Sequence, residues 1–223
     1  MIQQNASRTT PSPFLIKICG ITRLEDGLAA LEAGADWLGF IRWPRSARYL
    51  PLDLLIDLIN NLKSRAPRPF EAVGVYVNAA RETIEREASA AGLGRIQLHG
   101  DETLGFARAL GRPALKALRI RDAGSIRAAD DFEGLDLLAD AFDPALPGGT
   151  GLSYDYALLR ELTARRRVLI AGGLTADNVG GVIRALRPWG VDVSSGVESA
   201  PGVKDPLKVR EFINAARQAA KEQ

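Results

Sequence analysis

Short apolar runs alternate with longer segments of helical periodicity along almost the whole of this chain. The run FLIKIC at 14–19 is typical of a buried strand, and DGLAALEAG at 26–34 follows with apolar residues at helical spacing and a glycine at its end. The same alternation predicts strands over 14–19, 36–41, 71–77, 95–99, 113–120, 135–142, 167–173 and 190–196. It predicts helices over 26–34, 52–64, 80–92, 102–111, 125–132, 154–165, 176–187 and 205–222.

Strict alternation of strand and helix indicates βα units and a parallel sheet that helices cover. The number of strands favours a closed (β/α)₈ barrel, the TIM barrel of the α/β class, over a doubly wound open sheet. Neither a linker nor a change of composition interrupts residues 14–222, so we expect a single domain over 14–223. Residues 1–13 are rich in Ser, Thr, Pro and Asn, which predicts a flexible N-terminal extension.

Composition restricts the possible partners and the compartment. The 29 basic and 27 acidic residues leave a net charge of +2, which provides no electrostatic footprint for nucleic acid or for an anionic membrane. The chain has one cysteine, so it forms no intramolecular disulfide, and a reducing cytoplasm is the expected location. The polar start predicts no signal peptide, and no apolar run reaches the roughly 18 residues of a membrane span.

Small residues follow two neighbouring predicted strands. Gly172 and Gly173 come after the seventh strand, and Ser195 and Gly196 come after the eighth. The loops after these two strands form the usual phosphate site of a (β/α)₈ barrel, because glycine lets an anion approach backbone N–H groups. A further glycine-rich stretch at 147–151 is predicted to be either a lid over the ligand or an ordinary loop.

Candidate acids and bases stand at other strand ends. Cys19 ends the first strand and is either a small buried hydrophobe or, if its pKa is lowered, a thiolate base or nucleophile. Asp140 ends the sixth strand and is expected to face the mouth of the barrel, with a cap or a salt bridge as the alternative role. Asp143, in the loop that follows, is a competing candidate. His99, the single histidine, ends the fourth strand. It is either a ligand contact or a structural residue.

The loop after the second strand is basic. Arg48 lies there with Arg42 and Arg45, and the planar fork of an arginine suits a carboxylate ligand. Spacing does not distinguish which of the three points inward.

Several motifs, in order along the chain, together resemble the phosphoribosylanthranilate isomerase family. They are KICGITRLEDGLAALEAGADWLGF (17–40), PRSARYL (44–50), QLHGDE (97–102), LLADAFDPALPGGTGLSYDY (137–156), AGGLTADNV (171–179) and VDVSSGVESAPGVKDP (191–206). The resemblance covers about residues 17–215, and KICGIT and DVSSGVE are highly specific motifs of that family.

The resemblance implies a reaction and roles for individual residues. The family performs the Amadori rearrangement of N-(5-phosphoribosyl)anthranilate to 1-(2-carboxyphenylamino)-1-deoxyribulose 5-phosphate in tryptophan biosynthesis, without a metal or other cofactor. By resemblance, Cys19 is the general base, Asp140 the general acid, and Arg48 the ligand of the anthranilate carboxylate. The substrate-binding residues it implies are His99, Asp192, Gly172, Gly173, Ser195 and Gly196. We expect a small phosphosugar–anthranilate substrate and a monomer or homodimer.

The chain departs from the family pattern in two places, and other functions compete. Arg42 stands where the family usually has an uncharged residue, and the glycines at 180–181 are expected to weaken the helix after the seventh strand. The histidine-pathway isomerase is similar but uses two aspartates, one in place of Cys19. Indoleglycerol-phosphate synthase requires a lysine acid, for which Lys116 is the candidate. A barrel that binds a phosphate ligand without turnover is the non-enzymatic alternative.

Overall fold

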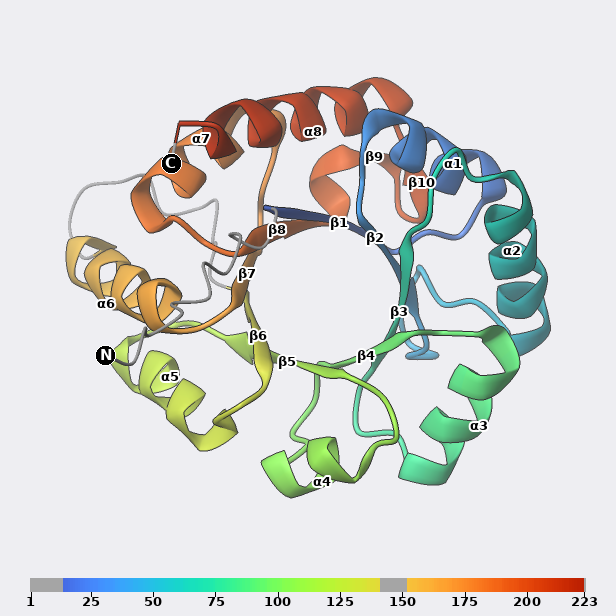
Figure 1. The fold of residues 1–223 in the computed structure, drawn as a ribbon, viewed down its shortest axis with the longest axis horizontal. Helices are drawn as coiled ribbons and strands as arrows, with labels where there is room; N and C mark the ends of the chain where they lie inside the picture. Colours follow the sequence, from blue (N-terminus) through green and yellow to red (C-terminus); the bar gives the residue numbers. More distant parts are fainter. Residues whose placement is uncertain (1–13, 141–151, 223) are drawn as a thin grey trace, which may run out of the picture.

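The computed structural model describes residues 14–140 and 152–222, with the side chains of 152–158 left out. Eight parallel strands close into a barrel in sequence order, and β1 completes the ring by pairing with β8 (Figure 1). The strands are β1 (Leu15–Cys19), β2 (Trp37–Ile41), β3 (Glu71–Tyr76), β4 (Arg95–Leu98), β5 (Ala114–Arg119), β6 (Asp136–Asp140), β7 (Val168–Ala171) and β8 (Gly190–Val193). The predicted (β/α)₈ barrel is therefore confirmed.

Helices surround the ring of strands (Figure 1). They are α1 (Leu24–Ala33), α2 (Leu52–Arg65), α3 (Arg81–Ala91), α4 (Leu104–Ala109), α5 (Ala123–Arg127), α6 (Leu152–Arg165), α7 (Ala176–Leu186) and α8 (Pro206–Ala220). In the described part of the chain, no helix is both long enough and apolar enough to cross a membrane. The predicted extension 1–13, the glycine-rich stretch 147–151 and Asp143 lie outside the described residues.

Apart from shifts of a few residues at the ends of elements, the structure differs from the expected elements after β5 and after β8. The helix predicted over 125–132 is divided into α5 and a 3₁₀ helix η1 (Ala128–Phe132). Asp122 caps the N-terminus of α5, where its side chain accepts a hydrogen bond from the Ser125 amide. After β8 the chain forms a 3₁₀ helix η2 (Ser195–Val197) and then a small antiparallel hairpin of β9 (Glu198–Ala200) and β10 (Val203–Lys204). The sequence did not predict this hairpin, because its strands are too short to show a period.

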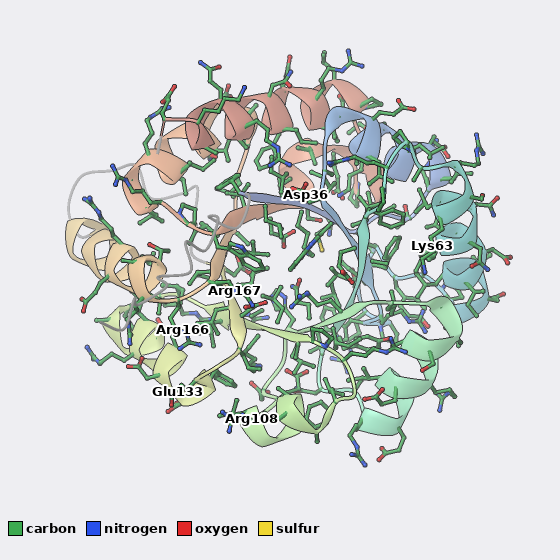
Figure 2. All side chains as sticks on the ribbon, viewed as in Figure 1. Asp36, Lys63, Arg108, Glu133, Arg166 and Arg167 are labelled. Atoms are coloured by element: carbon green, nitrogen blue, oxygen red, sulfur yellow. The ribbon has the colours of Figure 1, made fainter. Side chains whose placement is uncertain are left out.

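Side chains fill the space inside the ring of strands (Figure 2). The interior apolar cluster consists of Leu15, Trp37, Val73, Leu115, Ala117, Leu138, Leu169 and Ala171. The other face of each strand packs against the helices; in α2, for example, the predicted stripe of Leu55, Leu58, Ile59 and Leu62 is buried. Because both faces of the sheet are covered, the strands read as almost continuous apolar runs.

Polar contacts tie neighbouring elements together around the outside of the barrel. Lys63 of α2 donates a 2.8 Å hydrogen bond to the carbonyl of Gly92, which follows α3, and Arg108 of α4 donates a 3.0 Å bond to the carbonyl of Glu133 (Figure 2). At the amino ends of the strands, Trp37 and Trp189 meet edge to face with ring centroids 5.4 Å apart. That end of the barrel is thus closed by packing, which leaves the carboxyl ends of the strands for chemistry.

Candidate active site

A cavity of about 390 Å³ lies over the carboxyl ends of the strands and is bordered by every residue that the sequence predicts for the site. These residues are Cys19, Arg48, His99, Asp140, Gly172, Gly173, Asp192, Ser195 and Gly196. They come from six strand ends or the loops that follow them, so the closed barrel brings together positions that are far apart in the sequence.

Cys19 is a buried thiol at the end of β1, with 6% of its surface exposed. Its register partner on β2 is Gly39, where an added Cβ would lie 2.7 Å from the Cys19 sulfur and 2.9 Å from the Lys17 nitrogen. A larger residue at position 39 would therefore displace both groups. Glycine in this strand makes room for the thiol and the ammonium.

The charge state of Cys19 differs from the simplest expectation. Burial raises the pKa of the Cys19 thiol, the Lys17 ammonium lowers it and the Asp192 carboxylate raises it, with the pKa remaining above its ordinary value. A base role for Cys19 was expected if its pKa is lowered, and in the free protein this condition is not met. Without bound substrate, Cys19 is therefore a neutral thiol at neutral pH.

Lys17 and Asp192 form an ion pair inside the barrel wall. The Lys17 Nζ lies 2.9 Å from Asp192 Oδ1, and the side-chain exposures are 0% and 8%. Asp192 borders the cavity, as the resemblance suggested, but its pairing with Lys17 was not foreseen. The signal was present: a lysine in an apolar strand, two residues from Cys19, must point to the same side of that strand.

Asp140 and His99 face each other across the cavity. Asp140 ends β6 with 37% of its side chain exposed, and its Oδ2 lies 3.8 Å from the Nε2 of His99, which is longer than a hydrogen bond. The Gln97 Nε2 lies 3.1 Å from His99 Nδ1, an arrangement that leaves the proton of a neutral imidazole on Nε2, toward Asp140. Gln97, which was not predicted, also borders the cavity, and its Oε1 is buried without a partner among the described residues.

Of the three arginines after β2, Arg48 is the one that borders the cavity. Its guanidinium meets Glu198 at two points, with Nε 2.7 Å from Oε1 and Nη2 2.6 Å from Oε2. Glu198 also accepts a 2.8 Å hydrogen bond from Lys204, which in turn donates to the carbonyl of Ser194. Glu198 and Lys204 were not predicted, although Glu198 lies in the DVSSGVE motif.

Arg42, which departs from the family pattern, is buried and paired with a residue of α3. It is 8% exposed, so it neither borders the cavity nor faces solvent. Its Nε lies 2.9 Å from a carboxylate oxygen of Glu87 on α3, its Nη1 donates to the carbonyl of Leu50, and its guanidinium lies 5.1 Å from the Tyr49 ring centroid. The extra charge of this chain is thus neutralised by a carboxylate of α3. Arg45 is exposed.

The small residues after β7 and β8 form one wall of the cavity. β7 ends at Ala171, two residues before the predicted end, because Gly172 and Gly173 have φ of +92° and +57°, outside the range of a strand. These glycines lead into α7, whose first turn offers amide N–H groups. At Gly196 an added Cβ would lie 1.8 Å from the Leu174 carbonyl oxygen, so the two loops are in close contact.

Lys116 does not reach this cavity. It lies on β5 in a separate cavity of about 470 Å³, where its Nζ is 3.0 Å from Glu102 Oε2 and 2.5 Å from the Gly100 carbonyl oxygen. A lysine acid at this site, which the indoleglycerol-phosphate synthase alternative requires, is therefore not available from Lys116.

Comparison with known proteins agrees with this geometry. A family model described as N-(5'phosphoribosyl)anthranilate (PRA) isomerase matches residues 16–215. The N-(5'-phosphoribosyl)anthranilate isomerase of Trichlorobacter lovleyi is 45% identical over 205 residues, which are 92% of this chain and 98% of that protein. The enzyme of the same name from Pelobacter propionicus is 42% identical over 207 residues, which are 93% of this chain and 97% of that protein.

Solved structures of phosphoribosyl anthranilate isomerases are also similar to this chain. Phosphoribosyl anthranilate isomerase from Thermotoga maritima is similar to this chain with a TM-score of 0.83 at 36% identity, over 92% of this chain and 99% of that chain. A structure of a phosphoribosyl anthranilate isomerase in complex with reduced 1-(o-carboxyphenylamino)-1-deoxyribulose 5-phosphate has a TM-score of 0.81 at 34% identity, over 92% of this chain and 99% of that chain. The barrel, the residues around its cavity and the match over residues 16–215 establish that this chain belongs to the phosphoribosylanthranilate isomerase family.

Proposed function

We propose that this chain isomerises N-(5'-phosphoribosyl)anthranilate with Asp140 as the general acid and Cys19 as the general base. The family fixes the reaction, an aldose–ketose isomerisation in tryptophan biosynthesis. The observation that carries the assignment is the placement of a carboxyl on β6 and a thiol on β1 at one cavity. Between them in the ring lie β7 and β8, whose following loops carry the small residues suited to a phosphate.

The first step requires an acid. The protonated carboxyl of Asp140 gives its proton to the furanose ring oxygen of the substrate, and the bond from this oxygen to C1′ breaks. The bond electrons go to the oxygen, and the nitrogen lone pair forms the C1′=N bond of a protonated Schiff base. Leu138 is buried on the same face of β6 as Asp140, and both border the cavity.

The second step requires a base. The thiolate of Cys19 takes the proton from C2′, and the electrons of that C–H bond move toward the positively charged nitrogen to form an enolamine. Protonation at C1′ and loss of the C2′ hydroxyl proton then give the ketone. Because Cys19 is neutral in the free protein, the thiolate must form in the substrate complex, where the positive charge of the protonated Schiff base favours a nearby anion.

Both ends of the substrate have a suitable partner. Arg48 uses Nε and Nη2 for Glu198, so its remaining edge, with Nη1, is the part proposed to bind the anthranilate carboxylate. The phosphate is proposed to lie on the loops that carry Gly172, Gly173, Ser195 and Gly196, where backbone N–H groups and the N-terminus of α7 favour an anion. The Ser194 hydroxyl borders the same cavity and is buried without a partner among the described residues.

A fluorescence assay tests this function directly. Loss of the anthranilate fluorescence of N-(5'-phosphoribosyl)anthranilate is followed with the purified full-length protein, with the aminoaldose substrate of the histidine pathway as the comparison. Turnover of the first substrate in large preference to the second is the expected result. Preference for the second substrate would favour the two-aspartate relative, and binding without turnover would favour the non-enzymatic alternative.

We infer a cytoplasmic location and a monomer or homodimer as the functional form. The first inference rests on the single cysteine and on a substrate of intermediary metabolism. The second rests on a related protein that is described as dimeric and was also crystallised as monomers. Light scattering on the purified protein measures the mass and distinguishes one subunit from two.

A further inference from the structure

Lys17 and Cys19 stand side by side in the wall of the barrel. They are two residues apart on β1, and both lie beside Gly39 of β2, at 2.9 Å and 2.7 Å from the point where a Cβ would be. Because both atoms lie so close to this one position, the Lys17 nitrogen and the Cys19 sulfur are within ~4–6 Å of each other. At this separation an opposite charge strongly favours ionisation of the thiol. The ammonium and the thiol are therefore direct electrostatic neighbours.

Stability does not explain why Lys17 is buried as an ion pair. Its side chain is fully buried, and the partner that the described residues provide for its Nζ is the Asp192 carboxylate at 2.9 Å. The interior positions around it are mostly apolar. Replacing a buried ion pair by packed apolar residues is often neutral or stabilising, so burial of this pair calls for a reason other than stability.

A second buried lysine provides the contrast. Lys116 pairs with Glu102 at 3.0 Å, but it also donates to the carbonyl of Gly100, and Glu102 accepts from the backbone amides of Asn78 and Gly100. That pair holds the loops after β3 and β4 in place. Lys17 has no comparable bond to a loop among the described residues.

We propose that Lys17 is a positioning residue for Cys19: its ammonium, held in place by Asp192, stabilises the thiolate that abstracts the substrate proton. This inference rests on the proposed role of Cys19 as the general base. Lys17 itself transfers no proton, and Asp192 keeps the ammonium from moving away from the sulfur. Substrate in the cavity reaches Cys19 and Asp192 but not Lys17, which does not border the cavity.

Other charged groups near Cys19 are already engaged. Lys204 on β10 and Arg48 after β2 both face it, and both are ion-paired with Glu198, at 2.8 Å and 2.6 Å. Burial raises the pKa of the Cys19 thiol, and among the groups that oppose this rise Lys17 has the largest effect. Burial also lowers the pKa of Lys17, but Asp192 and Cys19 outweigh burial and raise it, so Lys17 stays charged at neutral pH.

Because the chain has one cysteine, alkylation of the intact protein reports the ionisation of Cys19 alone. The rate of carbamidomethylation by iodoacetamide is measured across pH for the wild type and for Lys17→Met, and its midpoint gives the pKa of the thiol. We expect Lys17→Met to raise the midpoint by about one pH unit or more, and to lower kcat/KM at neutral pH by about tenfold for each unit of this rise.

Two further variants control this experiment. Lys17→Met/Asp192→Asn leaves no unpaired buried charge, so it keeps the measurement possible if the single variant fails to fold, and a smaller rise is expected. Lys116→Met removes the other buried lysine and should leave the midpoint unchanged. An unchanged midpoint in both Lys17 variants, or an equal shift in Lys116→Met, would overturn the proposal. Failure of the proposed function is visible separately, as near-normal turnover in Cys19→Ser.

Discussion

Arg48 and Glu198, 150 positions apart in the sequence, meet at two points beside the cavity, with nitrogen–oxygen distances of 2.7 Å and 2.6 Å. This planar contact fixes the orientation of the guanidinium and directs its free edge toward the proposed carboxylate of the substrate. Lys204 binds the same glutamate and the carbonyl of Ser194. Glu198 therefore connects the proposed anthranilate end of the site with the loop proposed to hold the phosphate.

Arg48→Lys is expected not to behave as a conservative change. A lysine keeps the charge but cannot contact Glu198 at two points and a substrate carboxylate at the same time. We expect KM for N-(5'-phosphoribosyl)anthranilate to rise by about tenfold or more, the effect of losing a charge-assisted hydrogen bond of ~1.5–3 kcal/mol. Steady-state kinetics measures it. Arg45→Ala is the matched control, and a larger loss of kcat/KM in Arg45→Ala than in Arg48→Ala would refute the assignment.

Glu198 is expected to make stability depend on pH. Burial alone would raise the pKa of Glu198, but the hydrogen bonds from Arg48 and Lys204 outweigh it and lower the pKa below its ordinary value. A carboxyl with a lowered folded-state pKa stabilises the fold above its unfolded pKa of about 4.3, and this contribution is lost as the pH falls through the folded value.

Urea unfolding of the wild type and Glu198→Gln at several pH values measures this contribution. The wild type should have the larger free energy of unfolding at neutral pH, and the difference should shrink toward pH of about 3. A difference that is the same at both ends of this range contradicts the lowered pKa. Glu211→Gln, on the exposed side of α8, is the matched control.

Cys19→Ser and Asp140→Asn are expected to abolish most of the turnover without unfolding the protein. Serine hardly ionises near neutral pH and asparagine has no proton to give at this acidity, so each change removes one of the two proton-transfer groups. General acid–base groups contribute about 100-fold to 10,000-fold each, so we expect kcat to fall at least about 100-fold. Binding of a product analogue, measured by calorimetry, should change little. A kcat close to that of the wild type in either variant would reject that residue's role.

Gly173→Asp is expected to weaken substrate binding through its charge. Gly173 has φ of +57°, a left-handed conformation that Asp and Asn tolerate better than other side chains. Gly173→Asn adds nearly the same volume without a negative charge, so the pair separates electrostatics from bulk. We expect KM to rise about tenfold more in Gly173→Asp than in Gly173→Asn, with similar thermal stability. Equal KM values in the two variants would mean that the phosphate binds elsewhere.

Gly181→Ala is expected to stabilise α7. The helix runs through both of its glycines, Gly181 is exposed, and an added Cβ there meets no atom within 4 Å. Alanine in a helix interior is favoured over glycine by about 0.5–1 kcal/mol, so the free energy of unfolding in urea should rise by this amount. Gly34→Ala is the opposite control, because Gly34 ends α1 with φ of +110° and alanine there should destabilise. A loss of stability in Gly181→Ala would contradict the open space seen at this position.

The sequence by itself determined the barrel, its approximate element boundaries and the set of strand ends that carry the chemistry. Periodicity is a local property, and runs such as 14–19 and 71–77 are buried on both faces whatever their partners are. Once the strands are known to be parallel, all their carboxyl ends lie at one end of the barrel. This placed Cys19, Asp140 and the glycines around one cavity before any contact between them was known.

Only the tertiary structure decided how these groups are paired. Lys17 meets Asp192 across 175 positions and Arg48 meets Glu198 across 150, whereas Arg42, six residues from Arg48, turns to Glu87. Spacing does not distinguish Arg42 from Arg48, which only the family resemblance singled out, because the choice depends on which carboxylate each guanidinium can reach once the chain is folded. The ionisation of Cys19 was undecided for the same reason: it depends on burial and on the distances to Lys17 and Asp192, and closure of the barrel sets both.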